Sequence, residues 1–221
     1  MGEPGRHTLF DALASVGKAL GHGRRAELVD VLSQGERHVD ELAGAIGQSV
    51  ANTSHHLQQL LRAGLVGTRR EGTRVYYSLA GDEVTALWLA MQKVAAAHVQ
   101  GIDDLIRCYV GDRSDLEAVT GEELLERLAV GDVVVLDVCD EAEYDAGHLP
   151  GAINVPVAEL QERLAQLPDD VTVVAYCRGP YCITSDGAVR TLTAAGRKAL
   201  RLVDGYPEWV AAGLPVEKRS A

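Results

Sequence analysis

The chain has 221 residues, a formal net charge of −11 and an apolar fraction of 47%, which exclude general disorder and suffice for one large domain or two ordinary ones. It has no run of about eighteen apolar residues, and its N-terminus lacks the apolar region of a secretory signal. We therefore expect a cytoplasmic protein with no membrane span. In a reducing compartment, cysteines at positions 108, 139, 177 and 182 favour catalysis, redox sensing or metal binding over a disulfide framework.

Helices separated by glycine turns are predicted in the first part of the chain. Leucines at helical spacing predict a helix over about 9–20, and further helices are expected at 24–33, 38–47 and 50–63. Ser49 is the expected N-cap of the last one. A short helix, a glycine turn and a serine-capped helix are typical of a helix-turn-helix. The side chains expected on its DNA-facing surface are Ser49, Asn52, Thr53, Ser54, His56 and Gln59.

A hairpin with arginines near its tip is predicted over 65–79. Two strands flank Glu71, Gly72 and Thr73, and the arginines are Arg69, Arg70 and Arg74. A basic hairpin after a helix-turn-helix is typical of a winged helix. Although the chain is acidic, phosphate contacts are local and salt screens distant charge, so we predict binding to double-stranded operator DNA.

One long helix is predicted from Asp82 to about Arg107. Its apolar stripe exceeds what a small DNA-binding domain has to cover, so we expect this 82–107 helix to form a homodimer that binds two half-sites. The polar stretch 108–114 is the expected linker. The predicted division is thus a DNA-binding and dimerisation domain at 1–107, this linker, and a second domain at 115–221.

Several motifs of the first domain resemble the ArsR/SmtB family of dimeric bacterial repressors. The resembling segments are 28–32, 39–43, 54–57, 62–66 and 72–77. The resemblance implies a winged helix-turn-helix repressor. The 38–47 helix lacks the Cys-x-Cys of arsenic-sensing members, and the long helix lacks the Asp-x-His of zinc-sensing members. We therefore expect no metal site of either kind, and no cofactor.

The second half of the chain alternates strands and helices, which predicts a parallel α/β sheet. Buried strands are expected at 132–138, 171–175 and 199–203. Cys139 and Cys177 directly follow the first two of these strands. Chemistry in such sheets gathers at the carboxyl ends of the strands, so both cysteines are expected on the same edge of the fold.

Cys177 opens a short loop that ends at Cys182 and leads into a helix over about 185–195. Backbone N–H groups converge in such a loop, and the positive end of the helix dipole points at it. We therefore expect a lowered pKa and a reactive thiolate at Cys177. A packed core cysteine is the alternative, but a second cysteine in one tight Gly-Pro loop favours the reactive role.

This half resembles a rhodanese domain in its motifs at 136–138, 143–144, 147–154, 174–178 and 205–209. The resemblance implies that Cys177 carries sulfur as a persulfide, stabilised by the N–H groups of Arg178, Gly179 and their neighbours up to Ile183. Cys182 stands where many members have an arginine, and Cys139 stands where many follow Asp-Val with arginine. The loss of the loop arginine weakens the case for a thiosulfate sulfurtransferase, a phosphatase or an arsenate reductase, because an arginine there could bind a dianion with two hydrogen bonds. The two cysteines at these positions supply thiols that could react with a persulfide or sulfenic acid on Cys177.

Three functions stay open. The leading hypothesis is a transcriptional regulator, expected to be a repressor, whose rhodanese-like domain senses sulfane sulfur or oxidants through Cys177 and Cys182. The second is an active sulfurtransferase with a regulatory DNA-binding domain. The third is a sensor of a soft metal or metalloid that uses Cys139, Cys177 and Cys182 as thiolates. The sequence identifies no residue that would couple the two domains.

Overall fold

The computed structural model of the protein describes residues 5–219. Its contacts divide the chain into two compact units, one extending to Gln92 and the other starting at Lys93. Residues 93–107, which the sequence analysis assigned to the first domain, group with the second unit. The limits 1–107 and 115–221 stay a prediction, and their outermost residues, 1–4 and 220–221, lie outside the described part.

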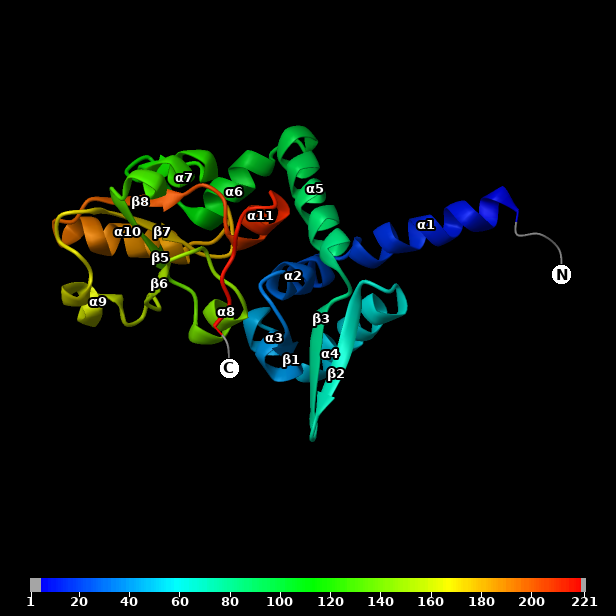
Figure 1. Ribbon diagram of the computed structural model, residues 1–221. Helices are drawn as coiled ribbons and strands as arrows, with labels where there is room; N and C mark the ends of the chain where they lie inside the picture. Colours follow the sequence, from blue (N-terminus) through cyan, green and yellow to red (C-terminus); the bar gives the residue numbers. More distant parts are fainter. Residues whose placement is uncertain (1–4, 220–221) are drawn as a thin grey trace. The chain divides into compact units, whose positions relative to one another are not determined.

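The first unit is a winged helix-turn-helix, as predicted (Figure 1). Its sheet is antiparallel, in the order β1-β3-β2. Its helices and strands are α1 (Arg6–Leu20), α2 (Gly23–Leu32), β1 (Arg37–His38), α3 (Val39–Ala45), α4 (Val50–Arg62), β2 (Val66–Glu71) and β3 (Arg74–Leu79).

The core of this unit forms where the apolar stripes of its helices meet. Leu28, Leu42, Leu57 and Leu60 are fully buried there. Gly47 joins α3 to α4 with a φ of 59°, a conformation that residues with a Cβ rarely adopt. The Ser49 side chain then caps α4 by accepting a hydrogen bond from the Asn52 N–H at 3.3 Å. Together the turn and the cap fix where α4 begins.

The long helix expected at 82–107 is two helices, so this prediction was wrong. They are α5 (Asp82–His98) and α6 (Ile102–Val110). The break falls at Gly101, whose φ of 77° lies in the left-handed region and stops the α-helical course. Because α6 runs to Val110, residues 108–110 of the expected linker are helical.

The first part of α5 covers the core of the winged helix, contrary to the expectation that little core was left. Val84 is buried, and Leu87, Trp88 and Met91 pack against the same cluster. The Trp88 indole also donates a hydrogen bond to Asp30 at 2.8 Å. Farther along, Val94 is exposed. Only this later part of the apolar stripe is open for a partner.

The second unit is built on a parallel sheet in the order β4-β8-β7-β5-β6, which confirms the predicted α/β class. The strands are β4 (Ala118–Val119), β5 (Val133–Asp137), β6 (Ile153–Asn154), β7 (Thr172–Tyr176) and β8 (Ala199–Leu202). The helices are α7 (Gly121–Val130), α8 (Glu141–Ala146), α9 (Leu160–Arg163), η1 (Leu164–Gln166), α10 (Thr184–Ala194) and α11 (Tyr206–Ala211). Within the described residues, no helix combines the length and apolar composition needed to cross a bilayer.

The register of β5 against β7 determines where the cysteines emerge. Asp137 pairs with Tyr176 at the ends of these neighbouring parallel strands. The Tyr176 hydroxyl donates to the Asp137 carboxylate at 2.5 Å and accepts from the Leu149 N–H at 3.1 Å. Burial raises the pKa of Asp137. Cys139 and Cys177 follow directly, at the same edge of the sheet.

Candidate thiol site and nucleic-acid interface

The predicted DNA-facing residues of α4 do not all lie on its outer surface. Ser49 and Asn52 are exposed, and Ser54 is partly exposed. Thr53 is fully buried, so its predicted contact with DNA was wrong. Its position explains the error, because Thr53 precedes Leu57 by one helical turn and shares the inward stripe with it.

Neighbouring side chains hold Gln59 and change the pKa of His56. The Gln59 carbonyl accepts a hydrogen bond from the buried Arg25 at 2.7 Å, and its amide nitrogen lies 2.6 Å from the His55 ring. Burial, with added repulsion from His22 and Arg25, lowers the pKa of the partly exposed His56. His55, which was not among the predicted DNA-facing residues, is exposed on the same helix.

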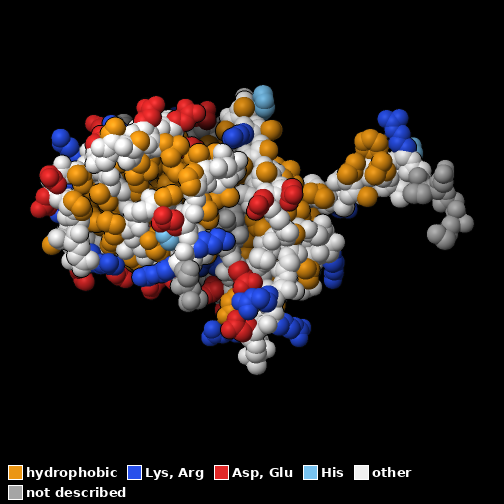
Figure 2. Space-filling model, viewed as in Figure 1, with side chains coloured by type: hydrophobic (Ala, Val, Ile, Leu, Met, Phe, Trp, Pro, Cys, Tyr) orange, Lys and Arg blue, Asp and Glu red, His pale blue; other side chains and the backbone are white. Residues whose placement is uncertain are grey.

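The arginines of the wing differ in how firmly they are held. Arg69 pairs with Glu36 at 2.6 Å and Glu71 at 2.8 Å, and both hydrogen bonds raise its pKa. Arg70 and Arg74 are exposed on β2 and β3. Figure 2 shows basic and acidic side chains intermixed around the tip of this hairpin. Arg70 and Arg74 are therefore the better placed of the predicted arginines to meet phosphates.

An exposed apolar stripe on α1 was not predicted as a functional surface. Leu9, Phe10 and Leu13 are 58%, 55% and 61% exposed. Hydrophobic side chains gather over this part of α1 (Figure 2). The four-residue spacing of Leu9 and Leu13 was visible in the sequence, but spacing alone does not distinguish an inward stripe from an open one.

The structure brings Cys139, Cys177 and Cys182 together, and all three are free thiols. The Sγ atoms of the buried Cys139 and Cys177 are 2.9 Å apart. The half-buried Cys182 also hydrogen-bonds to the Cys177 thiol. Cys139 therefore reaches the loop, and Cys177 lies in contact with both other thiols.

The pKa of Cys177 is raised, which contradicts the lowered pKa expected from the loop and the helix dipole. The hydrogen bond with Cys139 raises it, burial adds to the shift, and the bond with Cys182 only partly opposes it. At Cys139 the bond with Cys177 lowers the pKa, but burial, Asp137 and Glu143 together bring it to about 12. The bond with Cys177 and burial also raise the pKa of Cys182.

Arg178 points to a carboxylate. Its guanidinium pairs with the buried Glu143 of α8, and its Nε donates to Oε1 at 2.8 Å. Because the Arg178 guanidinium is bound to Glu143, it does not offer a bidentate contact to a dianionic sulfur donor. Glu143 lies in one of the motifs that resemble a rhodanese domain, and its contact with Arg178 adds it to the residues around the cysteine loop.

The loop backbone is fixed from two directions. The Cys182 N–H donates to the Gly179 carbonyl at 3.0 Å, and the Tyr206 N–H donates to the Cys177 carbonyl at 3.2 Å. Gly205 lies so close that a Cβ there would collide with the backbone at Arg178 and Gly179. On the other side, Arg113 bonds to the loop carbonyls, and no pattern in the sequence indicated this residue.

Among residues 5–219, no group of three or more His, Cys, Asp or Glu side chains is arranged to hold a metal ion.

Two parts of the chain match known families. Residues 22–68 match "Bacterial regulatory protein, arsR family", and residues 120–212 match "Rhodanese-like domain". The HTH-type transcriptional regulator Rv0324 of Mycobacterium tuberculosis is 48% identical over 210 residues, which cover 95% of this chain and 92% of that protein. A protein named sulfurtransferase from Allochromatium vinosum is 32% identical over 99 residues, covering 44% of this chain and 92% of that protein.

Among solved structures, the homodimeric winged helix-turn-helix DNA-binding domain of Mb0332 from Mycobacterium bovis is 46% identical. The similarity covers 45% of this chain and 94% of that one, with a TM-score of 0.42.

Proposed function

This chain belongs to the ArsR family of bacterial regulatory proteins and carries a rhodanese-like domain, and we propose that it is an operator-binding repressor controlled by thiol chemistry in that second domain. The observation that carries the proposal is the contact of Cys177 with both Cys139 and Cys182 in a chain that begins with a winged helix. Sulfane sulfur or an oxidant is the proposed signal.

The DNA-binding half of the proposal rests on exposed side chains. The exposed Asn52 and the partly exposed Ser54 on α4 are the proposed contacts to base edges, and the exposed Arg70 and Arg74 are the proposed contacts to phosphates. The exposed apolar residues of α1 and Val94 of α5 are the proposed dimer surface. A dimer would present two copies of α4 to two half-sites of an operator.

The proposed sulfur chemistry proceeds in two exchanges. The Cys177 thiolate attacks a polysulfide, keeps one sulfur as a persulfide, and the shortened polysulfide leaves with the electron pair of the broken S–S bond. The thiolate of Cys139 or Cys182 then attacks Sγ of Cys177, forms a disulfide and expels hydrosulfide with the second electron pair. The two thiols lose two electrons, and the transferred sulfur gains them.

Peroxide would lead to the same product by a related route. The Cys177 thiolate attacks one peroxide oxygen, becomes a sulfenic acid and releases hydroxide. The second thiolate displaces that oxygen as hydroxide and forms the disulfide. Both signals therefore converge on an oxidised pair that includes Cys177.

The environment of the thiols favours a sensor over an enzyme. The hydrogen bond with Cys139 and burial raise the pKa of Cys177, so little thiolate is present near neutral pH. A sensor has to react once per signal, whereas a sulfurtransferase has to react at every turnover. Arg178 is also engaged with Glu143, and Cys182 stands in the place of a loop arginine.

A sulfurtransferase is the second candidate, and the likeness of residues in the rhodanese-like domain to the Allochromatium vinosum sulfurtransferase favours it. The two candidates differ in what a sulfur donor does. A sulfurtransferase passes sulfur repeatedly to a small thiol acceptor and leaves DNA affinity unchanged, whereas the sensor stops after one oxidation and changes its affinity for DNA.

The deciding experiment follows thiol chemistry and DNA binding in parallel. Operator DNA is selected from random duplexes with the reduced protein. Wild type, Cys177→Ser, Cys182→Ser and Cys139→Ser are treated with polysulfide, peroxide or arsenite, analysed by mass spectrometry and titrated with the operator. We expect wild type to lose the mass of two hydrogens and to bind the operator at least about tenfold more weakly after polysulfide, the size of an ordinary allosteric effect.

Cys177→Ser should show neither change, and the two other variants should show which thiol is the partner. Rapid turnover of sulfur with unchanged operator affinity would replace the sensor by the enzyme. Stoichiometric arsenite binding that each cysteine substitution abolishes, with operator release, would replace it by the metalloid sensor.

A further inference from the structure

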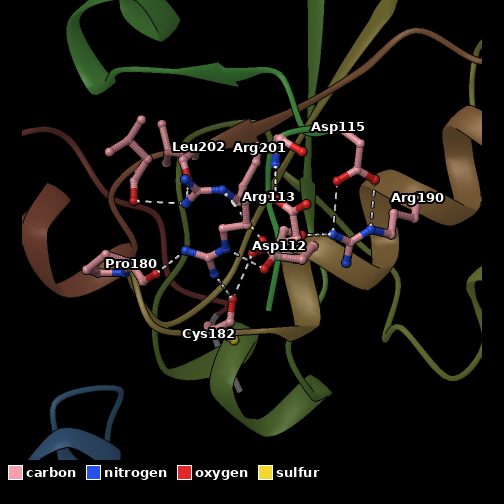
Figure 3. A network of polar contacts seen from close by, with 12 residues as sticks. Asp112, Arg113, Asp115, Pro180, Cys182, Arg190, Arg201 and Leu202 are labelled. Atoms are coloured by element: carbon pink, nitrogen blue, oxygen red, sulfur yellow. Dashed lines mark hydrogen bonds and ion pairs between the residues drawn. The ribbon is translucent and has the colours of Figure 1, made fainter. Parts of the chain in front are cut away.

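Arg113 connects the segment after α6 to the cysteine loop. It lies between α6 and β4, and its guanidinium makes a separate hydrogen bond from each of its three nitrogens (Figure 3). Nη1 donates to the Pro180 carbonyl at 2.7 Å, Nη2 to the Cys182 carbonyl at 3.2 Å, and Nε to the Asp186 carboxylate at 2.6 Å. One side chain thus binds both the loop and the first turn of α10.

The loop carbonyls contribute to the electrostatic stabilisation of the Arg113 guanidinium, because the nearby carboxylate is shared with a second arginine. Asp186 is 1% exposed, and its other oxygen lies 3.5 Å from Nε of Arg201. Burial, followed by repulsion from Arg113, lowers the pKa of Arg201. Two arginines therefore share one buried carboxylate, and the carbonyl dipoles at Pro180 and Cys182 supply the remaining negative potential around Arg113.

The residues on both sides of Arg113 are also held, so this segment is a strap rather than a loose tether. From α10, Arg190 donates to the Asp112 carbonyl at 2.6 Å and pairs with the Asp115 carboxylate at 3.1 Å (Figure 3). The Leu116 N–H donates to the Arg113 carbonyl at 3.0 Å. A movement of Arg113 therefore acts on the strap 112–116 and, through the chain, on α6.

A new covalent bond at Cys177 requires the loop to move, because the Cys177 thiol is buried between two other thiols. Cys177 is 4% exposed and contacts Cys139 and Cys182 at once. An added sulfur or a disulfide changes these contacts, and Cys182 carries one of the two carbonyls that Arg113 holds. Modification of the thiols and the position of the Arg113 guanidinium are therefore linked through the loop backbone.

We propose that Arg113 is the positioning residue that transmits the state of the cysteine loop to α6. This inference rests on the proposed function. With the thiols reduced, the Pro180 and Cys182 carbonyls hold Arg113 and the strap 112–116. When Cys177 is oxidised, the loop shifts, Arg113 loses its two carbonyl partners while it keeps its bond with Asp186, and the strap is held less firmly. α6 follows α5 after three residues, and α5 carries part of the proposed dimer surface.

The test compares Arg113→Gln with Arg190→Gln, which removes strap contacts but touches no loop carbonyl. Disulfide formation is followed by mass spectrometry as the loss of two hydrogens, and operator affinity is measured before and after polysulfide. Arg113→Gln lacks the carbonyl contacts from the start, so we expect the same loss of two hydrogens as in wild type and an operator affinity that is already about tenfold weaker when reduced. Polysulfide should then change this affinity by less than about twofold, against about tenfold in wild type. Arg190→Gln should keep most of the polysulfide effect on operator affinity. Arg113→Lys should keep only part of it, because one ammonium group cannot make the three separate hydrogen bonds of the guanidinium.

A second measurement on the wild-type protein does not depend on a variant that folds. Amide hydrogen exchange in residues 105–116 should rise on polysulfide treatment. A full operator response in Arg113→Gln, or unchanged exchange in 105–116 when wild type releases DNA, would overturn the role of Arg113 and leave the proposed function standing. If wild type forms the disulfide and keeps its operator affinity, the proposed function fails and this inference fails with it.

Discussion

The two halves of the protein hold the side chains of the proposed function in opposite environments. On the winged helix, Asn52, Arg70 and Arg74 are exposed, and the core is made by other residues such as Leu57. In the rhodanese-like domain, Cys139, Cys177 and Glu143 are 6%, 4% and 4% exposed and belong to the interior. In the first half, the residues proposed to bind DNA are therefore not those that stabilise the fold, whereas in the second half the residues proposed for thiol chemistry also belong to the core.

This difference affects how mutations should be interpreted. An exposed side chain can be removed with little effect on folding, so a loss of DNA binding reports on DNA contacts. A buried group at the thiol site has partners that lose their compensation when it is removed. A loss of chemistry there has to be separated from a loss of structure.

The largest effect is expected for Glu143→Leu. This change leaves the Arg178 guanidinium without its buried carboxylate and should lower the free energy of unfolding of the second unit by about 3 kcal/mol. Asn52→Ala should change stability by less than about 0.5 kcal/mol. Urea unfolding followed by tryptophan fluorescence measures both.

The double variant Glu143→Leu with Arg178→Leu is the matched control, because it removes both charges and should recover most of the loss. A single Glu143→Leu variant as stable as wild type would show that the ion pair is not part of the interior, and the contrast between the two halves would then be wrong.

The next effect is a loss of stability at alkaline pH. The pKa of Cys139 is about 12 in the folded protein, and the pKa of Cys177 is also raised. Unfolded thiols titrate near pH 8.5, so above about pH 8.5 and up to about pH 12 the unfolded chain releases protons that the folded chain keeps. Stability should fall with rising pH by about 1.4 kcal/mol per pH unit and thiol.

Urea unfolding of reduced protein between about pH 8 and about pH 10 measures this slope. Cys139→Ala should make it shallower, because one thiol no longer titrates. A stability that stays level over this range would mean that the thiols ionise easily within the fold, and the case for a single-reaction sensor would weaken.

The smallest effects are expected at the wing. Arg70→Ala and Arg74→Ala should each weaken operator binding by about threefold to tenfold and reduce the slope of log K against log salt by about 0.9. Arg69→Ala should matter less, because Glu36 and Glu71 already neutralise this arginine. Titrations at several salt concentrations test this order, and a dominant loss with Arg69→Ala would reverse it.

The sequence predicts best where local pattern determines structure. The glycine at 47, the cap at Ser49 and the alternation of strands and helices give both folds and the edge of the sheet that carries the cysteines. The prediction for Thr53 was wrong because it followed the polarity of the side chain. The helical position of Thr53, one turn before the buried Leu57, determines that it faces inward. The helix break was missed because an apolar stripe continues in sequence through a left-handed Gly101.

The environment of the thiols could not be predicted, because it depends on contacts between distant parts of the chain. The sequence places Cys177 before a helix and so predicts a lowered pKa. In the fold, the Cys177 Sγ lies 2.9 Å from the Cys139 Sγ and both thiols are buried. This contact and the burial raise the pKa of Cys177. Arg113 is similarly unmarked, since a lone arginine in a polar segment has no pattern that reveals its partners in the cysteine loop.

The closeness of Cys139 and Cys177 has a consequence for timing. The two residues are 38 positions apart, so a disulfide between them would close a loop and lower the entropy of the unfolded chain. The folded state would gain about 4 kcal/mol of stability in this way. The folded domain would favour the oxidised pair by a similar amount, and a reductant would have to reach sulfur atoms that are almost completely shielded from solvent. The protein would then stay in its induced state after the signal has disappeared, and its memory of one exposure would last as long as reduction takes.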